Sequence, residues 1–402
     1  PVRFSDHAIP IYRKNPLESY LDYEAVIQAA KDIGAEAIHP GYGFLAENAA
    51  FVRRCEEEGI IFIGPSADVI SLLGDKIEAR KAMEAAGLPV ARGSEEAIEE
   101  SSVAIQLAED IGYPVIIKAA AGGGGIGMQI VHSEDEFESA LSLCQSRAQS
   151  AFGDSRVFVE KFIEGAQHIE FQVLADGENA IHFGERFCSI QRRHQKLLEE
   201  GPWLTEEVRA KIGERVCEGA VSVGYRGLAT FEFLRDKHGE FYFLEVNPRV
   251  QVEHTITEMI TGVDLVKMGI QVAAGKGLEI KQEDIQFSGH SIQCRLNAED
   301  PIKFIPSPGK LWDCHFPGGR GVRVDTHAHI GYEMPGCFDS LLAKLIVWGQ
   351  DRDEAIAKMK AALTETTLIG VRTVIPLHLA ILNEPDFIAR DVTIQYLEDH
   401  PN

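Results

Sequence analysis

Two short strands joined by a tight turn, and the polar segment that follows them, constrain this chain most. Residues 230–234 and 240–244 are both rich in aromatic side chains, and the cluster Asp236-Lys237-His238-Gly239 between them is typical of a turn. We therefore expect an antiparallel hairpin. Glu232 would lie between two phenylalanines, where a carboxylate is costly unless it is paired or binds a metal ion.

The second strand of this hairpin runs into alternating polar residues. In an extended chain, one face would carry the side chains of Glu245, Asn247, Arg249, Gln251 and Glu253. Because proline cannot donate a ladder hydrogen bond, Pro248 indicates that the strand ends nearby. The alternative interpretation is an ordinary edge strand with one solvated face.

The chemistry of these side chains favours a functional site over that alternative. Glu232, Glu245 and Asn247 supply hard oxygen ligands, which suit Mg²⁺ or Mn²⁺ bridging nucleotide phosphates. Arg249 offers a planar fork for a small oxyanion such as bicarbonate. Glu253 would then be placed to act as a base beside that anion.

The glycine run from Gly122 to Gly127 has a less specific meaning. It matches a dinucleotide-binding spacing, but a strand follows it where that motif requires a helix. Met128 stands where a P-loop would have its lysine, so this motif is excluded too. Two interpretations stay open: a loop whose N–H groups close over phosphates, or a loop that is merely flexible.

Several cationic residues add to this picture. The segment from Gln191 to Lys196 is a short basic cluster in an acidic protein, and we favour a local anion site over a solvated loop or a nucleic-acid patch. Lys118 ends an apolar strand just before the glycine run, from which it can reach nucleotide phosphates. Lys76 is a single lysine of the kind usually found on surfaces. His168 and Glu170 lie in an alternating strand, and a half-buried strand explains them nearly as well as a site does.

Composition and charge restrict the class of protein. The formal net charge of −23 over 402 residues argues against nucleic acid or an anionic membrane as the main partner. No apolar run approaches the roughly 18 residues of a spanning helix. The first residues resemble neither a signal peptide nor a transit peptide, and the seven cysteines lack the close spacing of a zinc site. We therefore predict a cytoplasmic protein with reduced thiols.

The order of predicted elements indicates a mixed α/β and α+β chain. Strand–turn–helix units in residues 1–75 predict a parallel, Rossmann-like sheet. A second unit begins near Asp75-Lys76, and residues beyond 288 are rich in strands. We expect short buried strands at 36–39 and 60–63, and helices at 23–33, 134–148, 206–223 and 353–366.

These motifs together resemble the biotin carboxylase family of the ATP-grasp superfamily, in family order along essentially the whole chain. The most specific stretches are Arg192-Arg193-His194-Gln195-Lys196 and Gln251-Val252-Glu253-His254, which separate the chain from carbamoyl-phosphate synthetase. The resemblance implies an N-terminal domain over 1–75, an ATP-grasp domain over 76–287 with a glycine-rich lid at about 91–165, and a C-terminal domain over 288–402.

The resemblance also implies a reaction. Bicarbonate would attack the γ-phosphate of ATP to give carboxyphosphate, whose CO₂ carboxylates biotin while its phosphate takes the N1′ proton of biotin. Two Mg²⁺ or Mn²⁺ ions would assist. Biotin would be presented by a carrier protein or domain, with a carboxyltransferase as a further partner, and a homodimer is expected. The residue pattern leans towards the pyruvate carboxylase type. The alternatives are another ATP-grasp ligase or a nucleotide-binding regulatory subunit.

Individual residues receive roles through the same resemblance. ATP would be contacted by Lys76, Lys118, Gly124, Gly125, Glu160, Lys161, Phe162, Ile163, His168, Gln191, His194 and Leu234. Glu232, Glu245 and Asn247 would hold the metal ions. Bicarbonate and biotin would be bound by Tyr42, Lys196, Arg249, Gln251, Val252, Glu253 and Arg295. Among these, Glu253 would be the base that deprotonates bicarbonate, and Arg295 would stabilise the biotin enolate.

Three departures from the family pattern stand out. Family members usually begin roughly 40 residues earlier, so we expect the first sheet to lack part of its core. Ile126 replaces a lysine or arginine of the glycine loop. Gly201-Pro202-Trp203 replaces a more frequent Ala-Pro sequence.

Overall fold

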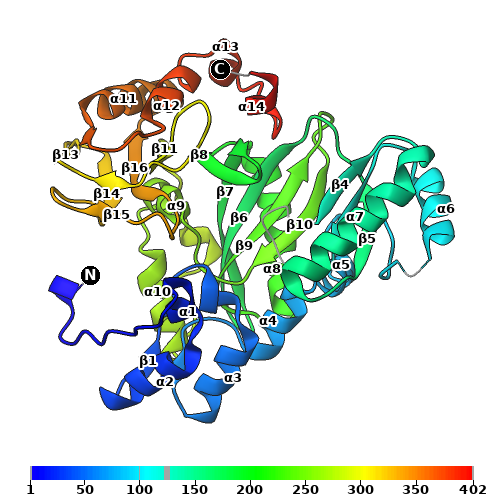
Figure 1. Ribbon diagram of the computed structural model, residues 1–402, viewed down its shortest axis with the longest axis horizontal. Coiled ribbons are helices and arrows are strands. Elements are labelled where there is room, and N and C mark those ends of the chain that lie inside the picture. Colours follow the sequence, from blue (N-terminus) through cyan, green and yellow to red (C-terminus); the bar gives the residue numbers. More distant parts are fainter. Residues whose placement is uncertain (1, 99, 122–126, 401–402) are drawn as a thin grey trace.

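The computed structural model describes residues 2–98, 100–121 and 127–400, and its centre is a single eight-stranded sheet. The strand order is β10-β9-β6-β7-β8-β11-β16-β14, and all neighbours are antiparallel (Figure 1). These strands are β6 (Gln167–Asp176), β7 (Ala180–Arg192), β8 (Gln195–Gly201), β9 (Arg226–Arg235), β10 (Phe241–Asn247), β11 (His290–Asn297), β14 (Val322–Thr326) and β16 (Leu341–Gly349). The sheet is continuous across the predicted boundary near residue 288, because β8 pairs with β11.

Helices cover this sheet and bury its apolar residues. α11 (Arg352–Glu365) packs on β16 and β11, while α9 (His254–Thr261) contacts β7, β8 and β11. α8 (Glu206–Ser222) and α10 (Leu265–Ala273) pack on the other half of the sheet. The predicted hairpin is β9 and β10, and the predicted helices 206–223 and 353–366 are confirmed as α8 and α11 within about a residue.

A separate small unit lies to the right in Figure 1. Three antiparallel strands, β3 (Val115–Ala119), β4 (Met128–Val131) and β5 (Val157–Lys161), are covered by α6 (Ser101–Ile111) and α7 (Glu134–Phe152). Phe137, Leu141 and Cys144 on α7 are buried against Val115, Ile117 and Val159, so this unit has its own core. Residues 122–126, which include most of the glycine run, lie outside the described residues.

The N-terminal region lies below the C-terminal strands in Figure 1. It contains α1 (Pro16–Leu21), α2 (Tyr23–Asp32), β1 (Ala37–Ile38), α3 (Ala49–Glu57), β2 (Ile61–Phe62), α4 (Ala67–Gly74) and α5 (Lys76–Ala85). The predicted parallel pairing is confirmed between β1 and β2. The prediction that both strands are buried is wrong in part: Phe62 is buried, but Ala37 and Ile61 are exposed, because among the described residues this sheet has only two strands.

The extended run predicted from Glu245 to Glu253 is also wrong in part. β10 ends at Asn247 before Pro248, and a bulge between Phe243 and Glu245 shifts its register. A turn follows, in which the His254 N–H donates to Gln251 O at 3.3 Å, and Glu253 directly precedes α9. The polar residues therefore do not share one face of a strand.

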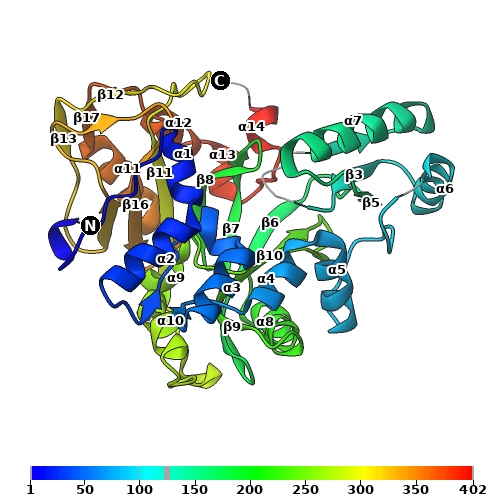
Figure 2. The ribbon, with the colours of Figure 1, turned by 60° about the horizontal axis from the view of Figure 1, so that its bottom comes forward.

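The remaining elements complete the C-terminal part, seen from below in Figure 2. They are β12 (Gly309–Lys310), β13 (Asp313–His315), β15 (Glu333–Met334), β17 (Thr367–Ile369), α12 (Ile375–Ile381), α13 (Pro385–Ala389) and α14 (Tyr396–Asp399). Ile394, just before α14, donates its N–H to Ala166 O at 2.9 Å and so returns the chain to β6. None of the described helices combines the length and apolar composition needed to cross a membrane.

Candidate active site

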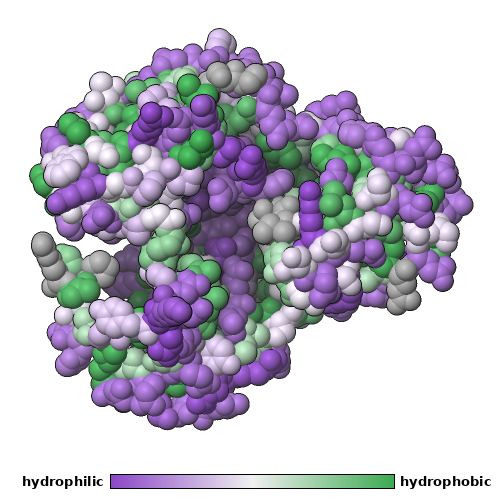
Figure 3. All heavy atoms as spheres, in the orientation of Figure 1, coloured by the Kyte–Doolittle hydropathy of each residue, from purple (hydrophilic) through white to green (hydrophobic). Residues whose placement is uncertain are grey.

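A pocket lies where the large sheet, the small sheet and the segment after β10 meet. The surface is hollowed at its centre, and hydrophilic residues line the hollow (Figure 3). The cavity volume is about 350 Å³, which suits a small-molecule ligand. Its walls come from segments that are far apart in the sequence, since Lys76, Phe162, Glu253 and Ile394 all contribute.

Most of the residues predicted for the site line this one pocket. From the ATP set they are Lys76, Lys118, Glu160, Lys161, Phe162, Ile163, His168, Gln191, His194 and Leu234. From the other sets they are Lys196, Glu232, Glu245, Asn247, Arg249, Gln251, Val252, Glu253 and Arg295. Tyr42 is outside the lining and 45% exposed. Gly124, Gly125 and Ile126 lie outside the described residues, so the two interpretations of the glycine run stay open.

Lys196 is the centre of the buried charge cluster. Its Nζ lies 2.8 Å from Glu232 Oε1 and 2.8 Å from Glu253 Oε1, and it also bonds Glu170. Burial alone would lower the pKa of Lys196, but these carboxylates hold that pKa well above its ordinary value. Lys196 therefore remains an ammonium ion that several carboxylates share.

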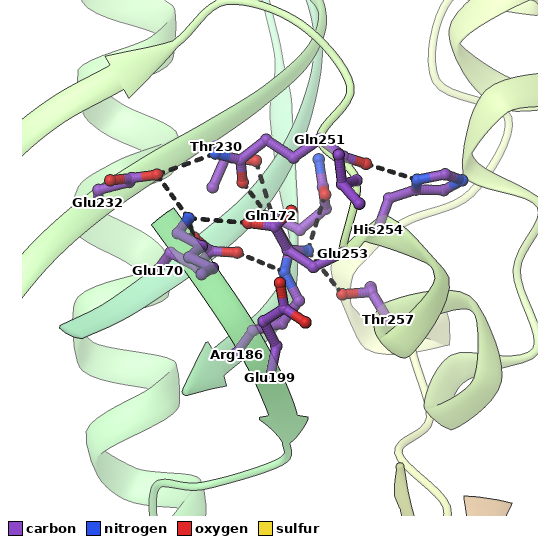
Figure 4. Close-up of polar contacts among 12 residues, drawn as sticks. Glu170, Gln172, Arg186, Glu199, Thr230, Glu232, Gln251, Glu253, His254 and Thr257 are labelled. Atoms are coloured by element: carbon purple, nitrogen blue, oxygen red, sulfur yellow. Dashed lines mark hydrogen bonds and ion pairs between the residues drawn. The ribbon is translucent and has the colours of Figure 1, made fainter. Parts of the chain in front are cut away.

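Two charged residues of this cluster were not assigned from the sequence. Arg186 is fully buried and donates to Glu170 (2.6 Å), Gln172 (2.9 Å) and Thr257 (2.9 Å), as Figure 4 shows. Glu170 thereby bridges Arg186 and Lys196. A signal was present, because charged residues stand in two strands rich in apolar side chains, and charges that become buried there need partners.

Glu253 lies between two cations at the inner end of the pocket. Its second oxygen accepts from Arg295 Nη2 at 3.0 Å, while its first accepts from Lys196. Burial raises the pKa of Glu253, but Lys196 and Arg295 outweigh it and hold that pKa well below the ordinary value. In the unliganded pocket Glu253 is therefore an ionised carboxylate.

Arg295 has a second carboxylate partner, Glu199, which sequence reasoning also missed. Glu199 Oε1 accepts from Arg295 Nε at 2.6 Å, and its other oxygen accepts from Gln293 at 3.0 Å. Burial raises the pKa of Glu199, although Arg295 opposes this. The guanidinium is thus held between Glu199 and Glu253, which fixes its plane.

The nucleotide side of the pocket holds further ion pairs. Lys118 Nζ lies 2.5 Å from Glu160 Oε2, and Lys76 bonds Glu245. Arg249 bonds Glu47 of the N-terminal region and donates to Asn247 Oδ1 at 2.8 Å. These cations are balanced by carboxylates at the pocket wall, so an anionic ligand must exchange places with a carboxylate to reach them.

The predicted metal ligands meet where the C-terminal end of β10 pairs with the interior of β9. Glu245 and Glu232 are register partners, and Asn247 Nδ2 donates to Glu232 Oε1 at 3.0 Å. Buried His168 points its Nε2 atom at Glu232 Oε2 (3.1 Å) without a hydrogen bond in the described structure. The carboxylate and amide oxygens are of the kind that Mg²⁺ or Mn²⁺ prefers, so the residues fit a divalent ion beside nucleotide phosphates.

The basic cluster forms the turn between β7 and β8. Arg193 and His194 both have positive φ angles, 48° and 64°, as a two-residue hairpin turn requires. Such angles are unfavourable for residues other than glycine, and strained turns of this kind gather at functional sites. The turn brings His194 and Lys196 to the pocket, while Arg192 stacks 4.0 Å above the Phe304 ring.

Comparison with known proteins identifies the family. Residues 1–70 match the model "Biotin carboxylase, N-terminal domain" and residues 293–399 match "Biotin carboxylase C-terminal domain". Residues 75–281 match "Carbamoyl-phosphate synthase L chain, ATP binding domain". The chain is 50% identical to the biotin carboxylase of Haemophilus influenzae over 401 residues, 99% of this chain and 89% of that protein. The chain belongs to the biotin carboxylase family.

Other relatives support this assignment. A pyruvate carboxylase subunit of Methanothermobacter thermautotrophicus is 50% identical over 403 residues, 99% of this chain and 82% of that protein. A biotin carboxylase–β-γ-ATP complex from Campylobacter jejuni superimposes with a TM-score of 0.97 at 46% identity, covering 99% of this chain and 90% of the other. The biotin carboxylase domain dimer of Hydrogenobacter thermophilus 2-oxoglutarate carboxylase, solved with MgADP, ADP and bicarbonate, gives 0.94 at 48% identity, covering 97% and 87%.

The predicted fold class and activity are confirmed by these matches. This family consists of ATP-dependent ligases that carboxylate biotin, and its N-terminal, ATP-grasp and C-terminal domains are all present. Relatives named for pyruvate and 2-oxoglutarate carboxylases match almost equally well, so the family does not decide which final acceptor is carboxylated. The predicted lean towards pyruvate stays a prediction.

The structure explains one departure from the family pattern. A Cβ atom at Gly201 would lie 2.9 Å from Glu185 O and 3.4 Å from the Ile256 side chain, so glycine relieves a tight contact. Trp203 stacks on Phe187 with centroids 3.9 Å apart, and the Arg390 guanidinium lies 4.8 Å above its ring. The bulky tryptophan is thereby built into the core beside β8.

Proposed function

We propose that the pocket performs the first half-reaction of a biotin-dependent carboxylase, with free or carrier-bound biotin as the acceptor. The observation that carries the assignment of roles is the Glu253 carboxylate held between Lys196 and Arg295. Bicarbonate is an oxyanion, and Lys196, Arg295 and the nearby Arg249 fork are the cations that suit it.

Bicarbonate binding changes the state of Glu253 in this proposal. A carboxylate with a strongly lowered pKa is a poor proton acceptor, because a base works best when its pKa is near the working pH. When bicarbonate takes over the interaction with Lys196, Glu253 loses part of its positive surroundings and its pKa rises. Glu253 then accepts the bicarbonate proton, and the bicarbonate oxygen attacks the γ-phosphate of ATP, so that carboxyphosphate forms and ADP leaves.

The remaining residues bind and orient the substrates. Lys76 and Lys118 neutralise phosphate charge after leaving Glu245 and Glu160, and Phe162 and Ile163 flank the adenine. Glu232, Glu245 and Asn247 would hold Mg²⁺ or Mn²⁺, two ions in all, which supply charge neutralisation on the phosphates. Arg295, fixed by Glu199, stabilises the biotin enolate, and Tyr42 lies on the approach from which the carrier presents biotin.

The relatives suggest the assembly. A domain dimer is described for the Hydrogenobacter thermophilus protein, and the matching Methanothermobacter thermautotrophicus protein is one subunit of a pyruvate carboxylase. We propose a homodimer that works with a biotin carrier and a carboxyltransferase in the cytoplasm.

The base is tested with Glu253→Gln, an isosteric change that removes its charge and its capacity to accept a proton. Biotin-stimulated, bicarbonate-dependent ADP release should fall by roughly 100-fold or more, while the KM for ATP stays within about twofold. Glu354→Gln on α11, outside the pocket lining and bonded to Lys358, is the control and should keep wild-type kinetics. Wild-type turnover in Glu253→Gln would refute the assignment of the base, and failure of biotin to stimulate the wild-type chain would refute the proposed function.

A further inference from the structure

The segment that would bind bicarbonate is supported by a residue outside the pocket. Gln251, Val252 and Glu253 lie in the turn between β10 and α9 and belong to neither element. The Ile256 N–H donates to Glu253 O at 3.1 Å and the His254 N–H to Gln251 O at 3.3 Å. The Val252 carbonyl instead accepts from the side chain of Lys344, at 3.0 Å from Nζ.

Lys344 lies on β16 at a fixed place beside Arg295. The two residues are register partners on neighbouring antiparallel strands, and Asp325 of β14 is the partner of Lys344 on its other side. Directly opposite residues point to the same face of a sheet, so Asp325, Lys344 and Arg295 form a row facing the turn. The Lys344 side chain is only 7% exposed, and Asp325 Oδ2 lies 3.3 Å from its Nζ.

We propose that Lys344 is a positioning residue for bicarbonate, which acts by holding the Val252 carbonyl. This inference rests on the proposed function, because it takes Gln251–Glu253 as the bicarbonate segment. The Val252 carbonyl and the Glu253 N–H belong to one planar peptide group, so fixing one fixes the other. That peptide group joins Val252 to Glu253, so its orientation affects where the Glu253 side chain lies.

The surrounding charges suit this role. Burial lowers the pKa of Lys344, but the Asp325 carboxylate opposes the change. Asp325 is itself held by Arg323, whose Nε lies 2.8 Å from Asp325 Oδ1. Arg323 Nη1 also lies 2.6 Å from Glu258 Oε2 on α9. The C-terminal strands thus hold the bicarbonate turn at Val252 and contact the helix that follows it at Glu258.

The test compares two lysines that both donate to a main-chain carbonyl. Lys344→Met removes the donor to Val252 with little change in side-chain volume, and should raise the KM for bicarbonate roughly tenfold, the effect of losing one hydrogen bond. The KM for ATP should stay within about twofold. Lys358→Met is the matched control, because Lys358 Nζ donates to Trp348 O at 2.5 Å far from the turn, and it should leave both constants unchanged.

Steady-state ATP hydrolysis with free biotin and Mg²⁺, varied in bicarbonate and then in ATP, separates the outcomes. An unchanged bicarbonate KM in Lys344→Met, or an equal rise in both constants, would overturn the inference. If that variant does not fold, Lys344→Arg carries the test, since its longer donor displaces the carbonyl and should still raise the bicarbonate KM selectively.

Arg249→Lys distinguishes failure of this inference from failure of the proposed function. Arg249 lines the pocket itself, and a point charge cannot replace its fork. If Arg249→Lys raises the bicarbonate KM while Lys344→Met does not, only the role of Lys344 is wrong. If neither variant changes it, the bicarbonate site lies elsewhere, and both proposals fail together.

Discussion

Glu199 and Glu200 are neighbours on β8, equally buried, and yet they belong to two different charge clusters. Successive strand residues point to opposite faces, so Glu199 reaches Arg295 and the pocket, whereas Glu200 points towards α11. There Glu200 accepts from Arg352 at 2.7 and 3.0 Å and contacts His290 at 2.7 Å. Arg352 also donates to the Phe387 and Ile388 carbonyls.

The two clusters differ in the pKa shift of their glutamate and in their position relative to the pocket. Arg352 and His290 outweigh the effect of burial and lower the pKa of Glu200 to about 2, whereas burial raises the pKa of Glu199. The Glu200 cluster is closed by protein groups, and Glu200, His290 and Arg352 lie outside the lining of the pocket. The Glu199 cluster borders the pocket, where in the proposed function ligands would replace some protein partners. The Glu200 cluster is therefore enclosed by protein groups, whereas the Glu199 cluster, which we propose to be catalytic, borders the pocket through Arg295 and Glu253.

The largest expected effect is a loss of stability when the Glu200 cluster loses its arginine. Arg352→Met leaves the Glu200 carboxylate buried with His290 as its remaining partner, and should lower the free energy of unfolding by about 3–5 kcal/mol. Denaturant unfolding measures this loss. Arg390→Met is the control: its guanidinium also lies over the Trp203 ring, and the loss should be below about 1 kcal/mol. Similar losses in both variants would show that ring contacts, and not the buried ion pair, stabilise this region.

The next effect distinguishes the two glutamates by function. Glu199→Gln removes the charge that orients Arg295, and kcat for biotin carboxylation should fall by roughly 10- to 100-fold, the effect of losing a charged hydrogen bond. The KM for ATP should change by less than about twofold. Glu200→Gln is the same substitution one residue further along, and should keep wild-type kinetics at 25 °C. Equal kinetic losses in the two variants would contradict the division into catalytic and structural clusters.

This comparison also shows what the sequence can and cannot predict. Glu232 and Glu245 were predicted because these carboxylates stand beside apolar residues in short, distinctive motifs, and Lys196 because it belongs to a short basic cluster. Glu199 and Glu200 are identical neighbours, and only the register of β8 against β11 decides which one faces the pocket. A shift of one residue would exchange them. Register depends on partners about a hundred positions away, and for the same reason Arg186 and Lys344 were not predicted.

The N-terminal region and the turn after β10 illustrate a second limit. Apolar runs at 36–39 and 60–63 indicated strands correctly, but burial depends on what covers them, which a local pattern does not contain. The alternation from Glu245 to Glu253 indicated residues that do line the pocket, but the extended strand predicted for them was wrong. Those side chains reach the pocket through a bulge and a turn, and Val252 lines it as well.

The smallest expected effect is the pH dependence of stability in the Glu200 cluster. Glu200 has a pKa of about 2 in the folded chain, below its ordinary value of 4.5. A lowered folded-state pKa stabilises the protein above the unfolded-state pKa, and this stabilisation is lost as the pH falls from about 5 towards 2.

Glu200→Gln has no such carboxylate to titrate. The difference in unfolding free energy between wild type and Glu200→Gln should therefore be constant from pH 7 to pH 6 and should shrink by about 1 kcal/mol at pH 4. Urea unfolding at each pH measures this difference, and subtracting the variant removes the titration of groups that do not contact Glu200. If the difference stays constant down to pH 4, the Glu200 pKa is not lowered, and the contrast between the closed and the open cluster would rest on geometry alone.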